Sequence, residues 1–334
     1  MPAPPGAPEW AADLYTAFES GASGQFILYG NVHDRLAAGD HLVNIEYYIE
    51  NELLAGFQVL FCYDLGNGLT VQRGAERLAE WVPAVMQTLP RDPQAAIRFV
   101  SRFGRYLGNL RAIGKPDNLQ VAVIIRGADQ LLPAQGNGFE HGSLTSLIRE
   151  WGCSPPFTEL AFASLLISDN LHDLEPLIAF GQQSTLVRVP LPSVSELRSA
   201  LTLLQREFPQ TIPPRTDLTA LAASMTGVSI STLEQLTKVR AHRKQVLQPS
   251  DFTILKKEMV EHDAPGLVEF VESKRTLDDY YGQHTLKAWF RQDVELWQKN
   301  DLRALPMGYL LCGPIARAKH FSSSAWRARP AFRL

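Results

Sequence analysis

The sequence has few cysteines, and they lie far apart. Cys62, Cys153 and Cys312 are the three cysteines of the 334-residue chain, and no two of them form a Cys-x-x-Cys pair. This spacing excludes the dense disulfide framework of small secreted domains. We therefore expect a protein of the reducing cytoplasm.

Charge of one sign and long hydrophobic runs are also missing. The net charge is only -3, so no global basic field points to nucleic acid or to an anionic membrane. No apolar run reaches the length of a membrane span. The N-terminus, MPAPPGAPEW, lacks the basic start and apolar core of a signal peptide. We expect a cytoplasmic protein with neither membrane nor nucleic-acid partners.

What remains is the composition of an ordinary globular protein. Hydrophobic residues make up 45% of the chain and charged residues 20%. A length of 334 residues leaves room for two domains, or for one large α/β domain and part of a second.

Five short apolar runs predict β-strands. The run at 119–125, LQVAVII, is uninterrupted and rich in Val and Ile, which is typical of a strand covered on both faces. Helical patterns separate the runs, so we expect an α/β fold whose parallel sheet carries helices on both faces. The predicted strands are residues 25–30, 57–63, 119–125, 162–167 and 185–189.

From Ser193 onward the pattern predicts helices only. Ser193 and Glu196 have the spacing of a capping box at the start of the first helix. Residues 266–282 have the composition of a linker, and a strand is expected from Gly308. Further helices are predicted at 218–225, 231–247, 251–261 and 285–299.

The most informative stretch is residues 307–314, MGYLLCGP. An apolar strand that ends in Gly313-Pro314 is how the phosphate-binding loop of an ATPase begins, but the loop should continue to Gly-Lys-Thr or Gly-Lys-Ser. Here it continues to Lys319 and His320 in a basic tail. An Ala before the lysine obstructs the positive-φ backbone of such a loop, and His320 cannot replace the Thr hydroxyl on Mg²⁺.

A shift of reading frame explains the break. One G restored after the Ile315 codon, with permitted codon choices, makes the tail read IGTGKTFLVECLAGEAGIPV, and Lys319 keeps its place. The loop then reads GPIGTGKT, a complete phosphate-binding motif. We interpret the tail as a frameshift or a sequencing error. The alternative is a natural basic tail, in which Arg317, Arg327, Arg329 and Arg333 could contact nucleic acid.

The order of elements resembles the AAA+ ATPase family, seen twice along the chain. The second copy is the clearer. Residues 277–287, LDDYYGQHTLK, look like the segment before the family's phosphate-binding loop, and residues 305–314, LPMGYLLCGP, match the strand that enters it. In this copy the disrupted loop would contribute Gly313, Pro314 and Lys319.

The first copy, over about residues 20–262, is degenerate. Gly30 and Asn31 stand where the first Walker motif belongs, but the second Gly, the Lys and the Ser or Thr are missing. After the strand that ends at Ile125 the family has two acids that handle Mg²⁺ and water, and here Asp129 is the only acid nearby. Asn170 takes the position of the family's polar sensor. Residues 221–236 resemble the signature of the helical lid.

Simpler readings of these residues stay open. Asp129 is also explained as a solvated loop acid or a helix cap, and Asn170 as a cap of the segment 171–177. His33 and His41 have no third ligand at usable spacing, so no metal site is expected. Ser143 and Ser229 lack a G-x-S-x-G elbow, so acyl transfer has no support.

The resemblance implies a three-layer, P-loop-NTPase-like parallel sheet with a C-terminal helical lid, followed by a truncated second module. We expect a flexible N-terminus and leading helix at 1–19, a degenerate AAA-type domain at 20–192, the helical lid at 193–262, a linker with the beginning of a second module at 263–314, and an aberrant, disordered tail at 315–334.

The functional expectation is the N-terminal portion of an AAA+ ATPase, itself hydrolysis-deficient. The family implies ATP and Mg²⁺ as cofactors, a hexameric ring of identical subunits, and protein clients that ATP hydrolysis remodels. In this chain the disrupted loop leaves open whether any cofactor binds. Two alternatives remain. One is a non-enzymatic adaptor with a pseudo-ATPase domain, and the other is a first domain that binds nucleotide without hydrolysis through Gly30, Asn31 and Asn170.

Overall fold

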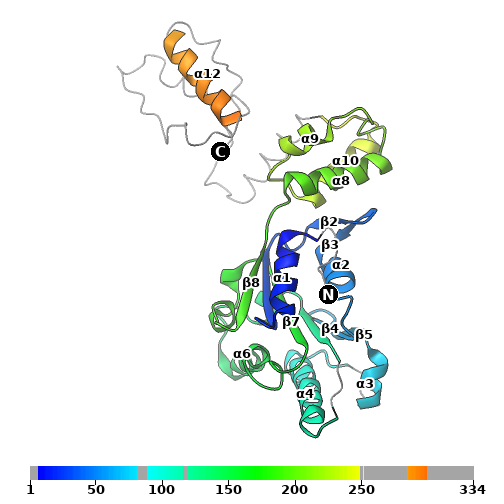
Figure 1. Cartoon of the computed structure of the whole chain (residues 1–334), viewed down its shortest axis with the longest axis vertical. Coiled ribbons are helices and arrows are strands. Elements are labelled where there is room, and N and C mark those ends of the chain that lie inside the picture. Colours follow the sequence, from blue (N-terminus) through cyan, green and yellow to red (C-terminus); the bar gives the residue numbers. More distant parts are fainter. Residues whose placement is uncertain (1–6, 82–88, 116–118, 249–250, 252–283, 299–334) are drawn as a thin grey trace. The chain divides into compact units, whose positions relative to one another are not determined.

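The chain divides into two compact units, residues 1–252 and 253–334. The computed structural model describes nearly all of the first unit and one helix of the second. The described residues are 7–81, 89–115, 119–248, 251 and 284–298 (Figure 1).

A six-stranded sheet forms the centre of the first unit. Five strands run parallel, and β5 pairs antiparallel with β4 at one edge. The order across the sheet is β5-β4-β6-β7-β1-β8, so β1 lies between β7 and β8. The predicted α/β fold with a parallel sheet is confirmed. The strands are β1 (Gln25–Gly30), β4 (Val59–Asp64), β5 (Gly68–Arg73), β6 (Val121–Ile125), β7 (Phe162–Ser168) and β8 (Ser184–Val189).

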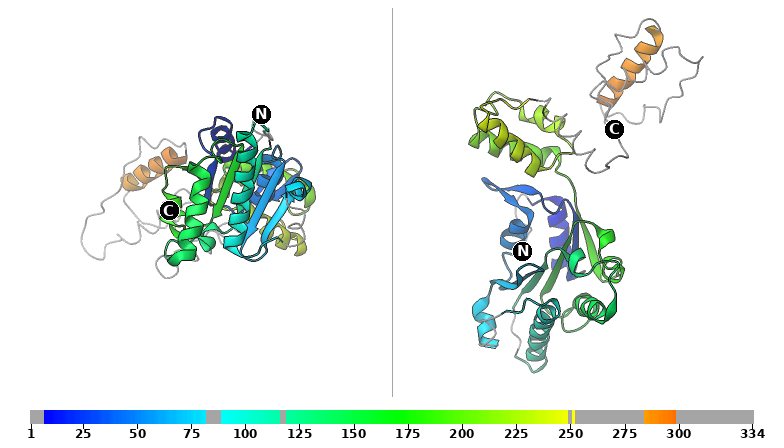
Figure 2. Two further views of the ribbon diagram at one scale, coloured as in Figure 1. Left: turned by 90° about the horizontal axis from the view of Figure 1, so that it is seen from below. Right: turned by 180° about the vertical axis from the view of Figure 1, so that it is seen from behind.

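Helices cover both faces of this sheet (Figures 1 and 2). Side chains alternate along a strand, so β6 sends Val121, Val123 and Ile125 into one buried cluster and Ala122 and Ile124 into the other. The first cluster includes apolar residues of α3 (Ala75–Trp81), α4 (Pro93–Ala112) and α6 (Gly138–Cys153). The second includes apolar residues of α1 (Glu9–Glu19). Burial on both faces is why the strands read as unbroken apolar runs.

The sequence does not predict β5. Gly68 and Leu69 are buried, but the other four residues of β5 are partly or fully exposed, because β5 lies at the edge of the sheet. The turn before it is held by Asp64, whose carboxylate accepts a hydrogen bond from the Asn67 N–H at 2.7 Å. Such a short hairpin needs no crossover helix, so it adds a strand without the helical spacing that marks the other strands.

A second hairpin follows β1 and was also missed. It consists of β2 (Arg35–Ala38) and β3 (His41–Asn44), joined at Gly39, whose φ is 57°. Both strands are short and only partly buried. They therefore lack the apolar run that indicates a strand of the central sheet. In an ATPase of this class a phosphate-binding loop and then a helix follow the first strand, so this hairpin changes what lies beside the end of β1.

Residues 45–53, which lie between two of the predicted strands, form two helical turns of different kinds. An α-helical turn, α2 (Ile45–Tyr48), continues into a π-helical turn, η1 (Ile49–Leu53). The Asn44 side chain caps the start by accepting a hydrogen bond from the Tyr47 N–H at 2.7 Å. Together α2 and η1 bury apolar residues against the same face of the sheet as α1.

After β8 the first unit continues as helices, which we call the helical subdomain. The predicted capping box is confirmed, because the Ser193 side chain accepts from the Glu196 N–H and the Glu196 side chain accepts from the Ser193 N–H. The described helices of the subdomain are α8 (Val194–Glu207), α9 (Leu218–Ser224) and α10 (Ile230–His242). In the second unit, α12 (His284–Gln298) occupies nearly the range predicted for a helix there.

Candidate functional site

The carboxyl ends of β1, β4, β6 and β7 meet at one edge of the sheet, where ligands bind in open α/β folds. The loops after these strands line a cavity of about 220 Å³. The predicted residue Asp129 is part of its lining. The other charged or titratable residues that line it are His33, Asp64, Arg126 and Asp169.

The loop after β1 uses its own main-chain donors. The Gly30 N–H donates to the Asp169 carbonyl at 3.1 Å, and the Asn31 N–H donates to the Val189 carbonyl at 3.0 Å. The next N–H, of Val32, donates back to Gly30 at 2.8 Å. These three donors therefore point at carbonyl oxygens of the same chain, whereas a phosphate-binding loop turns such groups toward the phosphates.

Gly30 is required where it stands. Its φ is 99°, and a Cβ atom there would lie 2.8 Å from the Val189 carbonyl oxygen. The glycine thus serves the close approach of the loop to β8. The Asn31 side chain is also engaged, because its Nδ2 donates to Oδ2 of Asp34 at 2.7 Å.

The loop after β6 carries a cation in place of acids. Arg126 and Gly127 follow β6 directly. The Arg126 guanidinium forms ion pairs with Glu46 of α2 at 3.0 Å and Glu50 of η1 at 2.5 Å. These three side chains are between 16% and 30% exposed, so solvent screens the cluster only in part.

The described geometry agrees with a match to a known family. The family described as the AAA+ chaperone, N-terminal Rossmann-like domain, matches residues 1–190, which is more than half of the 334-residue chain. The chain belongs to this AAA+ chaperone family. The resemblance to AAA+ proteins is thereby confirmed. No curated protein matches the chain.

The electrostatics of the AAA+ chaperone domain centre on Arg126. Partial burial works to lower the pKa of Arg126, but the Cys62 thiolate, which forms only at strongly alkaline pH, and the two glutamates outweigh it and hold the pKa above its usual value. For Asp64, burial works to raise the pKa, while hydrogen bonds from Asn67 and the charge of Arg126 hold it below its usual range. Both groups therefore stay charged near neutral pH.

Cys62 lies behind this cluster as a neutral thiol. Burial raises the pKa of Cys62 to about 12, even though the nearby Arg126 works to lower it. Its Sγ lies 3.8 Å from Oε1 of Glu50. A nucleophilic cysteine needs a lowered pKa, so Cys62 is a packing residue of the sheet.

The two remaining predicted residues of the first site each lie at the start of a short helix. Asp129 is in the first turn of α5 (Ala128–Leu131), where a negative charge is favourable. Asn170 is exposed and precedes the short helix η3 (Leu171–Asp173), and its Nδ2 donates to Asp173 at 3.1 Å. Its side chain makes no capping bond to the backbone of η3.

The predicted residues of the second copy, Gly313, Pro314 and Lys319, lie outside the described residues. Within the described ranges, no three His, Cys, Asp or Glu side chains are grouped so that they could hold a metal ion. His33 pairs instead with Asp169, at 2.7 Å. No helix of the described part of the chain is long and apolar enough to cross a membrane.

Sequence reasoning missed four residues that organise this edge: Asp34, Glu46, Glu50 and Arg126. The signal for Arg126 was present, because it is a charged residue that directly follows a buried strand. Its partners are 76 to 80 residues away in sequence, and the distance along the chain hides such pairs.

Proposed function

We propose that the first domain of this AAA+ chaperone neither hydrolyses nor binds ATP and acts through protein–protein contacts. The observation that carries the proposal is the ion-pair cluster of Arg126 with Glu46 and Glu50. A hydrolysing site of this class needs a carboxylate there to hold Mg²⁺ and another to orient the attacking water. A guanidinium has no acceptor atom that could bind the metal, and it cannot accept a proton.

The loop after β1 supports the same proposal. Its first three N–H groups are already hydrogen-bonded to carbonyl oxygens, and it has no lysine for the β- and γ-phosphates. The residues present therefore do not fit a bound ATP with Mg²⁺. Carboxylates of Asp64, Asp129 and Asp169 line the cavity, but a phosphate cradle would have to be built anew.

A nucleotide titration tests this proposal. The full chain is titrated with a fluorescent ATP analogue and Mg²⁺, and we expect no saturable signal at micromolar nucleotide. Asn170→Ala serves as the probe of the first site. Micromolar binding that weakens in this variant would overturn the proposal and would favour the alternative in which Gly30, Asn31 and Asn170 bind nucleotide without hydrolysis.

We further propose that ATP hydrolysis belongs to the second AAA module, whose phosphate-binding loop begins at Gly313 and Pro314. The support is the sequence pattern that restores Lys319 to GPIGTGKT under a single-base shift. Sequencing of the gene across codons 313–335 decides the matter. An ordinary stop codon with no rescued frame would remove this proposal and leave the non-enzymatic adaptor.

Members of AAA+ chaperone families assemble into oligomers and act on protein clients, and we propose both kinds of partner for this chain, in the cytoplasm. Sedimentation of the purified chain tests the first point. A monomer at all concentrations would contradict self-assembly by this portion of the protein.

A further inference from the structure

The loop after β1 also contains Asp34, an acid that the proposed function does not use. It is only 3% exposed, although it lies in the loop just after β1. A carboxylate so deeply buried is stable only if its oxygens accept hydrogen bonds or pair with a cation.

Asp34 meets this need with four hydrogen bonds. Within its own loop, Oδ1 accepts from the Arg35 N–H at 2.7 Å and Oδ2 accepts from the Asn31 side chain at 2.7 Å. The other two come from the helical subdomain. Oδ1 accepts from the Ser231 N–H at 2.8 Å and Oδ2 from the Ile230 N–H at 3.1 Å.

These last two donors are the first N–H groups of α10. A helix leaves its first four N–H groups without partners inside the helix. In α10 the Ser229 side chain accepts from the Thr232 N–H, and the Ser229 carbonyl accepts from the Leu233 N–H. Asp34 thus supplies what the helix itself cannot, namely acceptors for Ile230 and Ser231. Its negative charge is also favourable at a helix N-terminus.

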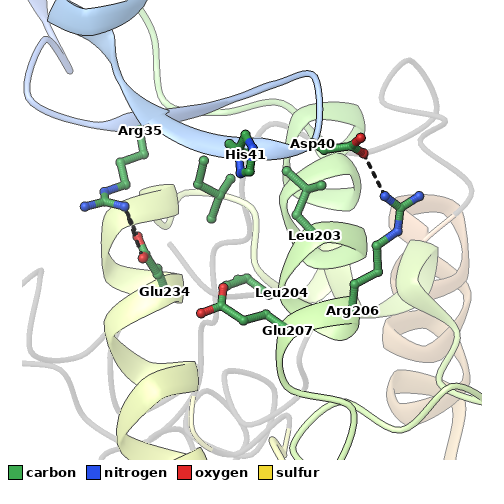
Figure 3. Close-up of a pocket in the computed structure, with 9 residues that line it drawn as sticks. Arg35, Asp40, His41, Leu203, Leu204, Arg206, Glu207 and Glu234 are labelled. Carbon is green, nitrogen blue, oxygen red and sulfur yellow. Dashed lines mark hydrogen bonds and ion pairs between the residues drawn. The ribbon is translucent and has the colours of Figure 1, made fainter.

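Two ion pairs connect the hairpin of β2 and β3, which directly follows Asp34, to helices of the helical subdomain (Figure 3). Arg35 of β2 pairs with Glu234 of α10 at 2.9 Å, and this glutamate is only 9% exposed. At the other end, Asp40 of the hairpin turn pairs with Arg206 of α8 at 2.8 Å, but both side chains are mostly exposed. Between the two pairs lies a cavity of about 490 Å³ lined by hairpin and helix residues.

We propose that Asp34 is an internal clasp that holds the helical subdomain on the α/β domain without nucleotide. In a nucleotide-binding relative the loop after the first strand carries the bound phosphates. Here that loop provides the anion itself, as a side chain, and the anion binds the first turn of α10. The position of the subdomain is then independent of ATP, and Arg35 with Glu234 adds a second, partly buried contact.

Hydrogen exchange of individual amides in the full chain tests the clasp. The first amides of a helix normally exchange freely. Protection of the Ile230 and Ser231 amides in the unmodified protein would therefore report their hydrogen bonds to the Asp34 carboxylate. We expect Asp34→Ala to speed their exchange by about tenfold or more, since local opening sets the rate. Addition of ATP with Mg²⁺ should leave the unmodified protein unchanged at both amides.

Asp40→Ala is the matched control. It removes a different aspartate, in the turn of the hairpin that follows Asp34, which also contacts the helical subdomain. Because that contact is exposed, the two amides should keep their protection. Free exchange of Ile230 and Ser231 in the unmodified protein would overturn the clasp even if Asp34→Ala does not fold.

A distance measurement separates the clasp from the proposed function. Spin labels are placed at the exposed positions Ile113 and Val239, in a background where Cys153 and Cys312 are serine. A single narrow distance, the same with and without ATP, is expected, and Asp34→Ala should broaden it. A broad distribution without ATP would overturn the clasp, whereas measurable ATP binding with a narrow one would overturn only the proposed lack of nucleotide binding.

Discussion

The loops after β1 and β6 end at the same edge of the sheet, yet they carry opposite charges at their key positions. The loop after β1 ends in a buried anion, Asp34, and the loop after β6 begins with a cation, Arg126. In a hydrolysing relative the signs are reversed: the first loop attracts phosphate and the second holds Mg²⁺. The loop after β1 thus carries a negative charge where the relative binds phosphate, and the loop after β6 carries a positive charge where the relative binds Mg²⁺.

The two loops differ in what their charge stabilises. The Asp34 carboxylate accepts hydrogen bonds from main-chain N–H groups of the helical subdomain, so it stabilises the contact between two parts of the first unit. Arg126 pairs with Glu46 and Glu50, which lie beside the sheet, so its effect stays within the α/β core. A loss of Arg126 should therefore lower global stability, whereas a loss of Asp34 should first release α10.

The largest expected effect is that of Arg126→Ala. It leaves Glu46 and Glu50 close together with no cation, and we expect a loss of about 3 kcal/mol in the free energy of unfolding. Urea denaturation measures it. Arg105→Ala, which breaks a more exposed pair with Glu150, is the control and should cost about 1 kcal/mol or less. Equal losses in both variants would show that the Arg126 cluster stabilises the fold no more than an exposed ion pair does.

Gly30→Ala should have the next largest effect. The positive φ and the 2.8 Å approach to the Val189 carbonyl together should cost about 2 kcal/mol of unfolding free energy. Gly21→Ala separates the two causes, because Gly21 also has a positive φ, of 71°, but nothing lies within 4 Å of a Cβ there. If both variants lose the same amount, the close approach to β8 is not what requires Gly30.

The last expected effect appears only at alkaline pH and is absent near neutral pH. Burial raises the pKa of Cys62 from 9.0 to about 12, so the folded chain holds this proton more tightly than the unfolded chain does. Stability from this group is therefore complete below pH 9 and is lost progressively as the pH rises from 9 to about 12. Tyr48 and Tyr63, whose pKa values burial also raises to about 12, add to the loss at higher pH.

Alkylation gives a simpler check on Cys62. With iodoacetamide near pH 8, the exposed Cys153 should be labelled and the buried Cys62 should not. Rapid labelling of Cys62 in the folded chain would mean that the sheet opens far more often than its burial implies.

The sequence was sufficient to predict the strands that are buried on both faces. Runs such as 119–125 are apolar throughout because helices cover both sides of β6. The strands β2 and β3 were missed because each is short and partly exposed, and β5 was missed because most of its residues are partly or fully exposed at the edge of the sheet. Local capping, as at Ser193, was readable because both partners lie within one turn.

The site was less predictable than the fold for a physical reason. Motif matching located the loops that contain Gly30 and Asp129, but it could only note which family residues were missing. Asp34 meets Ile230 and Ser231 across 196 and 197 residues of sequence, and Arg126 meets its glutamates across at least 76. Contacts of this range follow from the three-dimensional fold and leave no local pattern.

The buried carboxylate of Asp34 also bears on any attempt to give this domain nucleotide binding. A variant made to bind nucleotide would first have to lose this acid, and that loss should free α10 before any phosphate could bind in its place. Loss of this acid alone would thus weaken the protein without giving it nucleotide binding.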